Sequence, residues 1–199
     1  GRCQPDRRCR TAWRSGTPSR ALQWHGNAAG VDASLVAGRL LGLDIVGVDV
    51  ASQIGDVGLR GEAARLRPSA GRGFSRLMAG ADYAFAGGLT MSAELYYNGA
   101  GARDPVAYDL AAWSAGRVSN LATRYAGLFA SYEITPLLKW VNYAVVNVDD
   151  GSHGFDSRLV WSWRNNLDLT IGVQRFTGSA GSEYARMPNA AFAQLQWFF

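Results

Sequence analysis

The last ten residues constrain the fold of this chain more than any other stretch. In AAFAQLQWFF, residues 190–199, every second position counted back from the C-terminal residue is apolar: Phe199, Trp197, Leu195 and Ala193. The two glutamines of the segment lie between them. Because successive side chains of an extended strand point to opposite faces, this pattern predicts a β-strand with one apolar and one mostly polar face.

Segments of strand length also fill the chain upstream. Most of them have close to the roughly 9–11 residues that a tilted strand needs to cross a bilayer, whereas no apolar run is long enough for a transmembrane helix. Arg39 and Asn142 interrupt the alternation in two of the segments. The sequence therefore predicts an all-β chain of about ten strands. Their expected limits are 32–40, 44–52, 57–66, 74–85, 89–99, 122–134, 137–148, 155–164, 167–176 and 190–199.

The connections between these segments alternate in length. SQIGD, AGG, TP and RNN are short, whereas RPSAGRG, residues 100–121, DDGSHG and TGSAGSEYARMPN are long. Short turns at one rim and long loops at the other are typical of up-and-down antiparallel membrane barrels. A soluble antiparallel barrel or sandwich is the main alternative. It would explain the alternation of side chains, but it has no reason to keep this bias in loop length.

Side-chain parity predicts the register of three hairpins, since a one-residue slip would exchange the two faces. One of these pairings also places Glu133 opposite Lys139, a favourable cross-strand pair of opposite charge. The pairs beside the turns are expected to be Phe85 with Leu89, Trp163 with Leu167, and Ile134 with Leu138.

Aromatic residues of the apolar face gather beside the short turns. Amphipathic rings are enriched at membrane–water interfaces, so these side chains are predicted to form half of an interfacial girdle. They are Tyr83, Phe85, Tyr132, Trp140, Trp161, Trp163, Trp197 and Phe199.

Charged residues of the opposite face are predicted to point inward and line a pore. Four are cations and six are anions, so the field should be modest and ion selectivity weak. In a narrow barrel the same side chains would pair and fill the interior, and the sequence leaves both cases open. The residues are Asp49, Arg60, Glu62, Arg76, Asp82, Glu94, Glu133, Lys139, Arg158 and Asp168.

The long loop of residues 100–121 carries apolar side chains, among them Val106, Leu110 and Trp113. Exposed apolar clusters usually pack against something. We therefore expect this loop to fold inward, with an ordinary surface loop or an outward adhesive loop as the alternatives.

The basic character of the chain lies in its first residues. Residues 1–24 hold six arginines and one aspartate, so the remainder carries a net charge of −1 within a total of +4. This distribution disfavours a nucleic-acid partner. Residues 1–30 are predicted to be an arginine-rich tail or linker of unknown role, and residues 31–199 the barrel strands. Cys3 and Cys9 both lie in this tail, and no signal peptide is visible.

No catalytic constellation is recognisable. His25 and His153 are the only histidines, and no nucleophile motif or phosphate-binding loop is present. The segment DDGSHGFD, residues 149–156, collects three carboxylates, but it lacks the spacing of an EF-hand and is better interpreted as a hairpin connection than as a calcium site. We therefore expect no enzyme, no metal and no cofactor.

The phrases RYAGLFASYEITPLL, DDGS and AQLQWFF resemble the C-terminal portion of proteobacterial outer-membrane porin-like proteins. The resemblance implies a membrane β-barrel in the bacterial outer membrane, in contact with its lipid. It also implies passive diffusion of small hydrophilic solutes, recognition of the C-terminal strand by the barrel-assembly machinery, and a missing N-terminal half. The alternatives are a closed structural or adhesive barrel that acts through its extracellular loops, or an outer-membrane lipid-modifying enzyme. The oligomeric state stays open.

Overall fold

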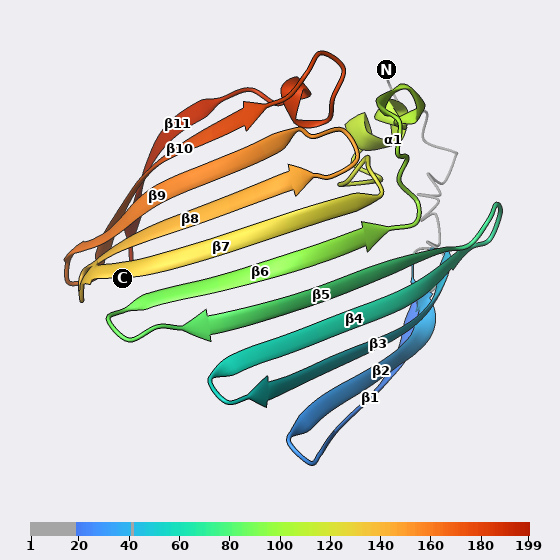
Figure 1. Ribbon diagram of the computed structural model, residues 1–199, viewed down its shortest axis with the longest axis horizontal. Helices are drawn as coiled ribbons and strands as arrows, with labels where there is room; N and C mark the ends of the chain where they lie inside the picture. The colour runs from blue at the N-terminus through green and yellow to red at the C-terminus, as the bar shows by residue number, and fades with distance from the viewer. Residues whose placement is uncertain (1–18, 41) are drawn as a thin grey trace, which may run out of the picture.

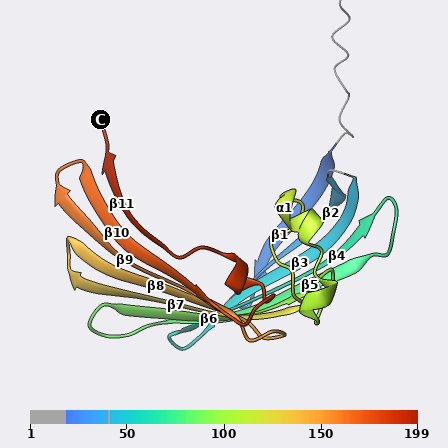
Figure 2. The same cartoon turned by 90° about the horizontal axis from the view of Figure 1, so that it is seen from above.

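A single antiparallel sheet dominates the computed structural model, which describes residues 19–40 and 42–199 (Figure 1). Its eleven strands lie in chain order, so each pairs with the next along the sequence. Within the described residues β1 and β11 are not paired, and the sheet curls into an open trough (Figure 2). The strands are β1 (Arg20–Ala28), β2 (Val31–Leu40), β3 (Leu43–Ile54), β4 (Val57–Pro68), β5 (Phe74–Ala84), β6 (Leu89–Asn98), β7 (Arg124–Thr135), β8 (Leu138–Asn147), β9 (His153–Arg164), β10 (Leu167–Thr177) and β11 (Ala190–Trp197).

Strand β1 corrects the predicted boundary of the tail at residue 30. The segment RALQWHGNA pairs along its whole length with β2, and a tight turn at Ala29 and Gly30, both with positive φ, joins the two strands. Leu22 and Trp24 alternate with polar neighbours, but the arginines before them obscured the pattern. Residues 1–18, with Cys3 and Cys9, lie outside the described residues.

The hairpin at residues 85–89 has the predicted register: the backbone N–H of Phe85 donates to the carbonyl of Leu89 at 2.7 Å. In the β7–β8 hairpin, Lys139 Nζ lies 2.8 Å from Glu133 Oε1, as expected. Beside the turn, however, a bulge pairs Thr135 with Leu138 in place of Ile134.

The β9–β10 hairpin also differs from the prediction at its turn. Arg164 rather than Trp163 opposes Leu167, because a bulge follows Leu167, and Asn166 takes a φ of 61° in the turn. Beyond this bulge the register returns to the predicted one, with Trp161 opposite Leu169. A bulge adds one residue to one strand without disturbing the faces farther along.

The convex side of the trough, here called the outer face, is mostly apolar, with charged side chains among the described residues only at its long-loop end. The register and the alternation along each strand place all eight predicted interfacial aromatics on it, counting Phe85 and Phe199 as the continuations of β5 and β11. Large side chains stand open to the surroundings, including Val46 at 63%, Leu95 at 65% and Trp197 at 72% exposure. A continuous apolar surface of this extent is typical of contact with lipid or protein. None of the helices in the described part of the chain is long and apolar enough to cross a bilayer.

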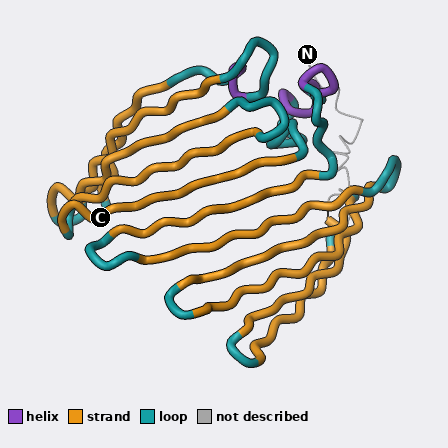
Figure 3. Tube along the Cα trace, in the orientation of Figure 1, coloured by secondary structure: helices purple, strands orange, loops and turns teal. Residues whose placement is uncertain are grey.

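The concave side, here called the inner face, carries the packed core at its long-loop end. The loop between β6 and β7 contains η1 (Pro105–Ala107) and α1 (Leu110–Ser114), and it lies over the trough together with η2 (Tyr184–Arg186) (Figures 2 and 3). Tyr108 and Leu121 of this loop pack on Tyr125, and Trp113 packs beside them. The loop therefore packs inward as predicted, and of the three apolar residues expected to do so Trp113 does, whereas Val106 stays 94% and Leu110 36% exposed.

Candidate functional site

The ten residues predicted to line a pore all lie on the inner face. The register carries this parity from strand to strand, for example from Asp49 opposite Glu62 to Glu133 opposite Lys139. The same register runs through every pair from β3 to β10. The strand pairing therefore places all ten residues on one face of the sheet, whereas their role in lining a pore stays a prediction.

Cations and anions of the inner face form ion pairs, some between strands and one within a strand. Arg60 Nη2 donates to Glu94 Oε1 at 2.5 Å, and its Nη1 lies 3.7 Å from Asp82 Oδ1. At the other end of the trough, Arg158 Nε donates to Asp156 Oδ1 at 2.7 Å. Pairing of this kind interleaves opposite charges along the wall and weakens any net field in the trough.

Two details of this charge arrangement were not expected. Asp156 is absent from the predicted set, although its parity with Arg158 on the same strand could have revealed it. Arg76 has no carboxylate partner among the described residues, and its guanidinium carbon lies 5.4 Å from the centroid of the Phe74 ring.

Aromatic rings lie against the inner wall around a hollow of about 480 Å³. The centroids of Phe129 and Tyr143 are 4.9 Å apart, and Phe176 borders the same hollow. Phe176 lies over Gly154, where an added Cβ would come within 2.9 Å of the ring. The glycine lets the ring lie flat against the neighbouring strand, which leaves space in the trough.

A buried glutamate joins the long loops over the inner face. Glu183, which precedes η2, is 1% exposed, and its carboxylate accepts three hydrogen bonds. The donors are Leu121 N at 2.9 Å, Tyr125 Oη at 2.6 Å and Asn147 Nδ2 at 2.8 Å. We call this group the loop hub. It ties the β6–β7 and β10–β11 loops to strands β7 and β8, and the sequence analysis missed it because its members are far apart in the chain.

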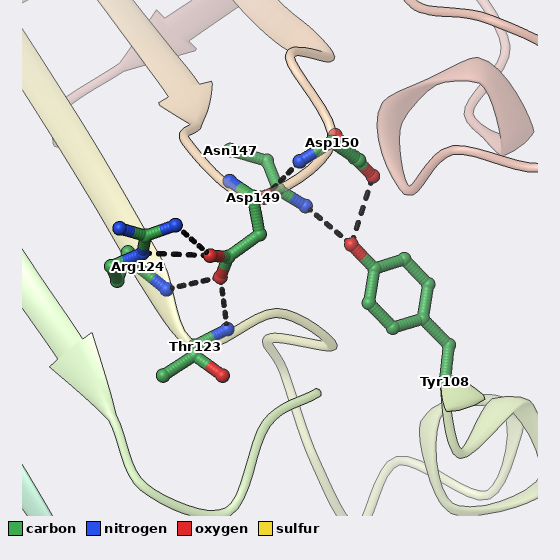
Figure 4. A network of polar contacts seen from close by, with 6 residues as sticks. All are labelled: Tyr108, Thr123, Arg124, Asn147, Asp149 and Asp150. Carbon is green, nitrogen blue, oxygen red and sulfur yellow. Dashed lines mark hydrogen bonds and ion pairs between the residues drawn. The ribbon is translucent and has the colours of Figure 1, made fainter. Parts of the chain in front are cut away.

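The two aspartates of the DDGS segment extend the hub (Figure 4). Asp149 Oδ2 accepts from the backbone N–H groups of Thr123 and Arg124, both at 2.8 Å, and Oδ1 accepts from Arg124 Nε at 2.7 Å. Asp150 Oδ2 accepts from Tyr108 Oη at 2.9 Å. These carboxylates hold N–H and O–H donors, which a calcium ion would have to displace. No cluster of three metal-ligating side chains occurs among the residues described.

Ionisation of the hub follows from this geometry. Burial raises the pKa of the Tyr108 phenol above its ordinary value, and the nearby Asp150 carboxylate adds to the effect. Burial of Asp150 opposes ionisation, but hydrogen bonds from Ser152 and from the Glu183 N–H outweigh it and lower the pKa of the carboxyl. The hub therefore favours a neutral Tyr108 phenol that donates a hydrogen bond to the charged Asp150 carboxylate.

Comparison with known proteins places the fold. No family model and no curated protein matches the chain. A triple mutant of the Rh. blastica porin superposes with a TM-score of 0.61 at 14% identity, over 90% of this chain and 55% of the porin. The outer membrane channel DcaP of Acinetobacter baumannii superposes with a TM-score of 0.55 at 11% identity, over 88% of this chain and 60% of DcaP. The chain thus spans little more than half the length of these neighbours. It has the up-and-down antiparallel fold of a porin barrel wall, open between β1 and β11.

Proposed function

We propose that this chain forms part of the wall of a bacterial outer-membrane barrel through which small hydrophilic solutes diffuse passively. One observation carries the proposal: the sheet separates a mostly apolar outer face from an inner face with charged and polar side chains, several of them in ion pairs. Outer-membrane barrels have an apolar outward band and a polar interior, so this division fits a wall between lipid and water. The fold shared with a porin and an outer membrane channel supports the same conclusion.

In this proposal the ten predicted inner-face residues line the water-filled interior. Their charges replace part of the hydration shell of a passing solute, so no nucleophile or cofactor is required. Because the cations Arg60, Lys139 and Arg158 each contact a carboxylate, selectivity should be weak. The folded loops over the long-loop end would narrow the entrance on that side.

The alternatives rest on fewer observations. A closed adhesive barrel would act through loops that extend outward, whereas here Tyr108 and Glu183 hold two long loops against the trough. A lipid-modifying enzyme would need a nucleophile beside a base. His153 is exposed at the start of β9, and its Nδ1 lies 3.5 Å from the carbonyl of Gly151. Recognition of β11 by the barrel-assembly machinery is part of the same proposal.

Single-channel recording of the purified chain in a planar bilayer, combined with heat-modifiable gel migration, tests the proposal. We expect discrete ohmic steps from a heat-modifiable species. A heat-modifiable but silent species would exclude the open pore and favour the closed barrel. A water-soluble species without a gel shift would refute the membrane assignment altogether.

A further inference from the structure

The arginines of the outer face occupy one end of it. In β1 to β4 the register places Arg20 opposite Arg39, Arg39 opposite Asp44, and Asp44 opposite Arg67. We call the three cations Arg20, Arg39 and Arg67 the arginine row. Apart from Arg65, close to Arg67 on β4, the rest of the outer face in these strands is apolar or small, so the charge is confined to the long-loop end.

The arginine row has an excess of positive charge. Residues directly opposite on neighbouring strands have Cβ atoms about 4.5–5.5 Å apart, and like charges at this spacing are destabilising. Asp44 serves only Arg39, whose Nε lies 3.1 Å from Asp44 Oδ1. Neither Arg20 nor Arg67 has a carboxylate at ion-pair distance in the part of the chain that the structure describes. The row, three cations with one anion, therefore lacks counter-charge.

A hollow of about 460 Å³ lies beside the row, between Arg20, Arg39 and Asp44. On β4, Arg65 adds a further cation on the same face, two residues before Arg67, and donates from Nη1 to Ser75 Oγ at 3.1 Å. Guanidinium groups match the oxygens of phosphate with two parallel hydrogen bonds, so a group of arginines around a shallow hollow is suited to phosphate.

The depth of the row indicates the source of that phosphate. Arg67 lies ten residues along β4 from Val57. That is roughly 33 Å along the strand, or roughly 25 Å along the membrane normal at a tilt of about 40°, which matches the height of the apolar band of an outer-membrane barrel. The row would therefore lie where the acyl chains end and the headgroups begin. The side chains of the row point away from the trough, so a soluble solute that passes through the trough does not meet them.

We propose that the arginine row binds phosphate monoesters on the headgroup of a membrane lipid at the long-loop side of the barrel. The inference rests on the membrane location in the proposed function, but it does not need an open pore. Arg124, by comparison, reaches the same rim from β7 but is already neutralised by Asp149, with Nη2 and Oδ1 2.7 Å apart.

The test uses the full chain in zwitterionic micelles and an acyl-labelled glycolipid that carries phosphate monoesters. The wild-type protein should bind it, and the same glycolipid with its phosphates removed should not compete. Inorganic phosphate should compete only weakly, because it has no acyl anchor for the apolar outer face. Equal competition by the dephosphorylated glycolipid would overturn the proposal, and tight binding of inorganic phosphate would replace the lipid with a soluble anion.

Matched variants locate the site. The double variant Arg20→Gln/Arg67→Gln should bind the phosphorylated glycolipid about 30-fold more weakly. This factor corresponds to the loss of about 1 kcal/mol of attraction to the anionic headgroup for each of the two arginines. The control Arg103→Gln/Arg117→Gln removes two exposed arginines of the β6–β7 loop and should bind as the wild type does. An equal loss of affinity in both variants, or no loss in the first variant, would refute lipid binding by the arginine row.

Failure of this inference and failure of the channel are distinguishable. Heat-modifiable migration reports whether each variant folds. If Arg20→Gln/Arg67→Gln does not fold, the proposal is tested by the wild-type protein alone, through its binding of the phosphorylated and the dephosphorylated glycolipid. Conductance is recorded separately in phosphatidylcholine bilayers. A protein that does not conduct but still prefers the phosphorylated glycolipid would support lipid binding by the arginine row and exclude the open pore. A protein that conducts but lacks this preference would refute lipid binding by the row and leave the channel proposal intact.

Discussion

Replacing Glu183 should release the long loops while leaving the barrel wall intact. In Glu183→Gln the side chain keeps its shape, but one of its two acceptor oxygens becomes an NH₂ donor. If the remaining oxygen serves Tyr125 Oη and Asn147 Nδ2, the new amide faces the N–H of Leu121, which then has no acceptor. A buried donor without a partner costs about 1–3 kcal/mol.

The cost should appear as local opening, because the hub anchors loops rather than strands. A loss of about 1–3 kcal/mol corresponds to roughly 5- to 150-fold faster amide exchange at Leu121 and Ala122. Hydrogen–deuterium exchange by mass spectrometry on the reconstituted protein measures it, and β8 amides away from the hub should keep their protection. Glu183→Ala removes all three acceptor contacts and should abolish protection in the loop.

The matched control is Glu133→Gln. Glu133 makes its ion pair with Lys139 at the opposite rim, where both side chains are about half exposed, so the exchange of the loop amides should not change. Wild-type exchange at Leu121 in Glu183→Gln would refute the account of the hub. Equal acceleration in both variants would show a general destabilisation of the barrel instead.

Three further predictions follow from the same contacts. Because hydrogen bonds lower the folded-state pKa of Asp150, its contribution to loop stability is fully present above the ordinary carboxyl value of 3.8 and is lost as the pH falls through the lower folded value, which exchange measured over acid pH should detect. Gly172→Ala should destabilise the barrel to urea by about 1–3 kcal/mol, since its Cβ would lie 2.6 Å from the Phe192 ring, whereas Gly127→Ala, with no heavy atom nearer than 3.9 Å, should cost little; similar urea midpoints for both would contradict this. Glu94→Gln should leave its arginine partner less neutralised and move the reversal potential in a salt gradient toward anion preference, and an unchanged potential would place this pair outside the conducting path.

Alternation of side chains was sufficient to predict the faces of the sheet. The opposition of Glu133 and Lys139 and the shared face of the ten inward residues follow from parity, which is a local property with a period of two. The same reasoning placed the limits of most strands within a few residues. It did not find the bulges beside Thr135 and Leu167, because an extra residue in one strand leaves the alternation on either side intact.

The tertiary structure alone decided which distant groups meet. Glu183 lies 62 residues from Leu121 and 36 from Asn147 in the chain, so no local pattern predicts the loop hub. The arginine row has a similar origin, since its three arginines lie in three different strands and only the lateral register aligns them. The sequence by itself determined a wall with one apolar and one polar face, because hydrophobic alternation acts residue by residue. The closed loops, and the charges concentrated at one rim, depend on strand pairing and loop packing between segments far apart in the chain.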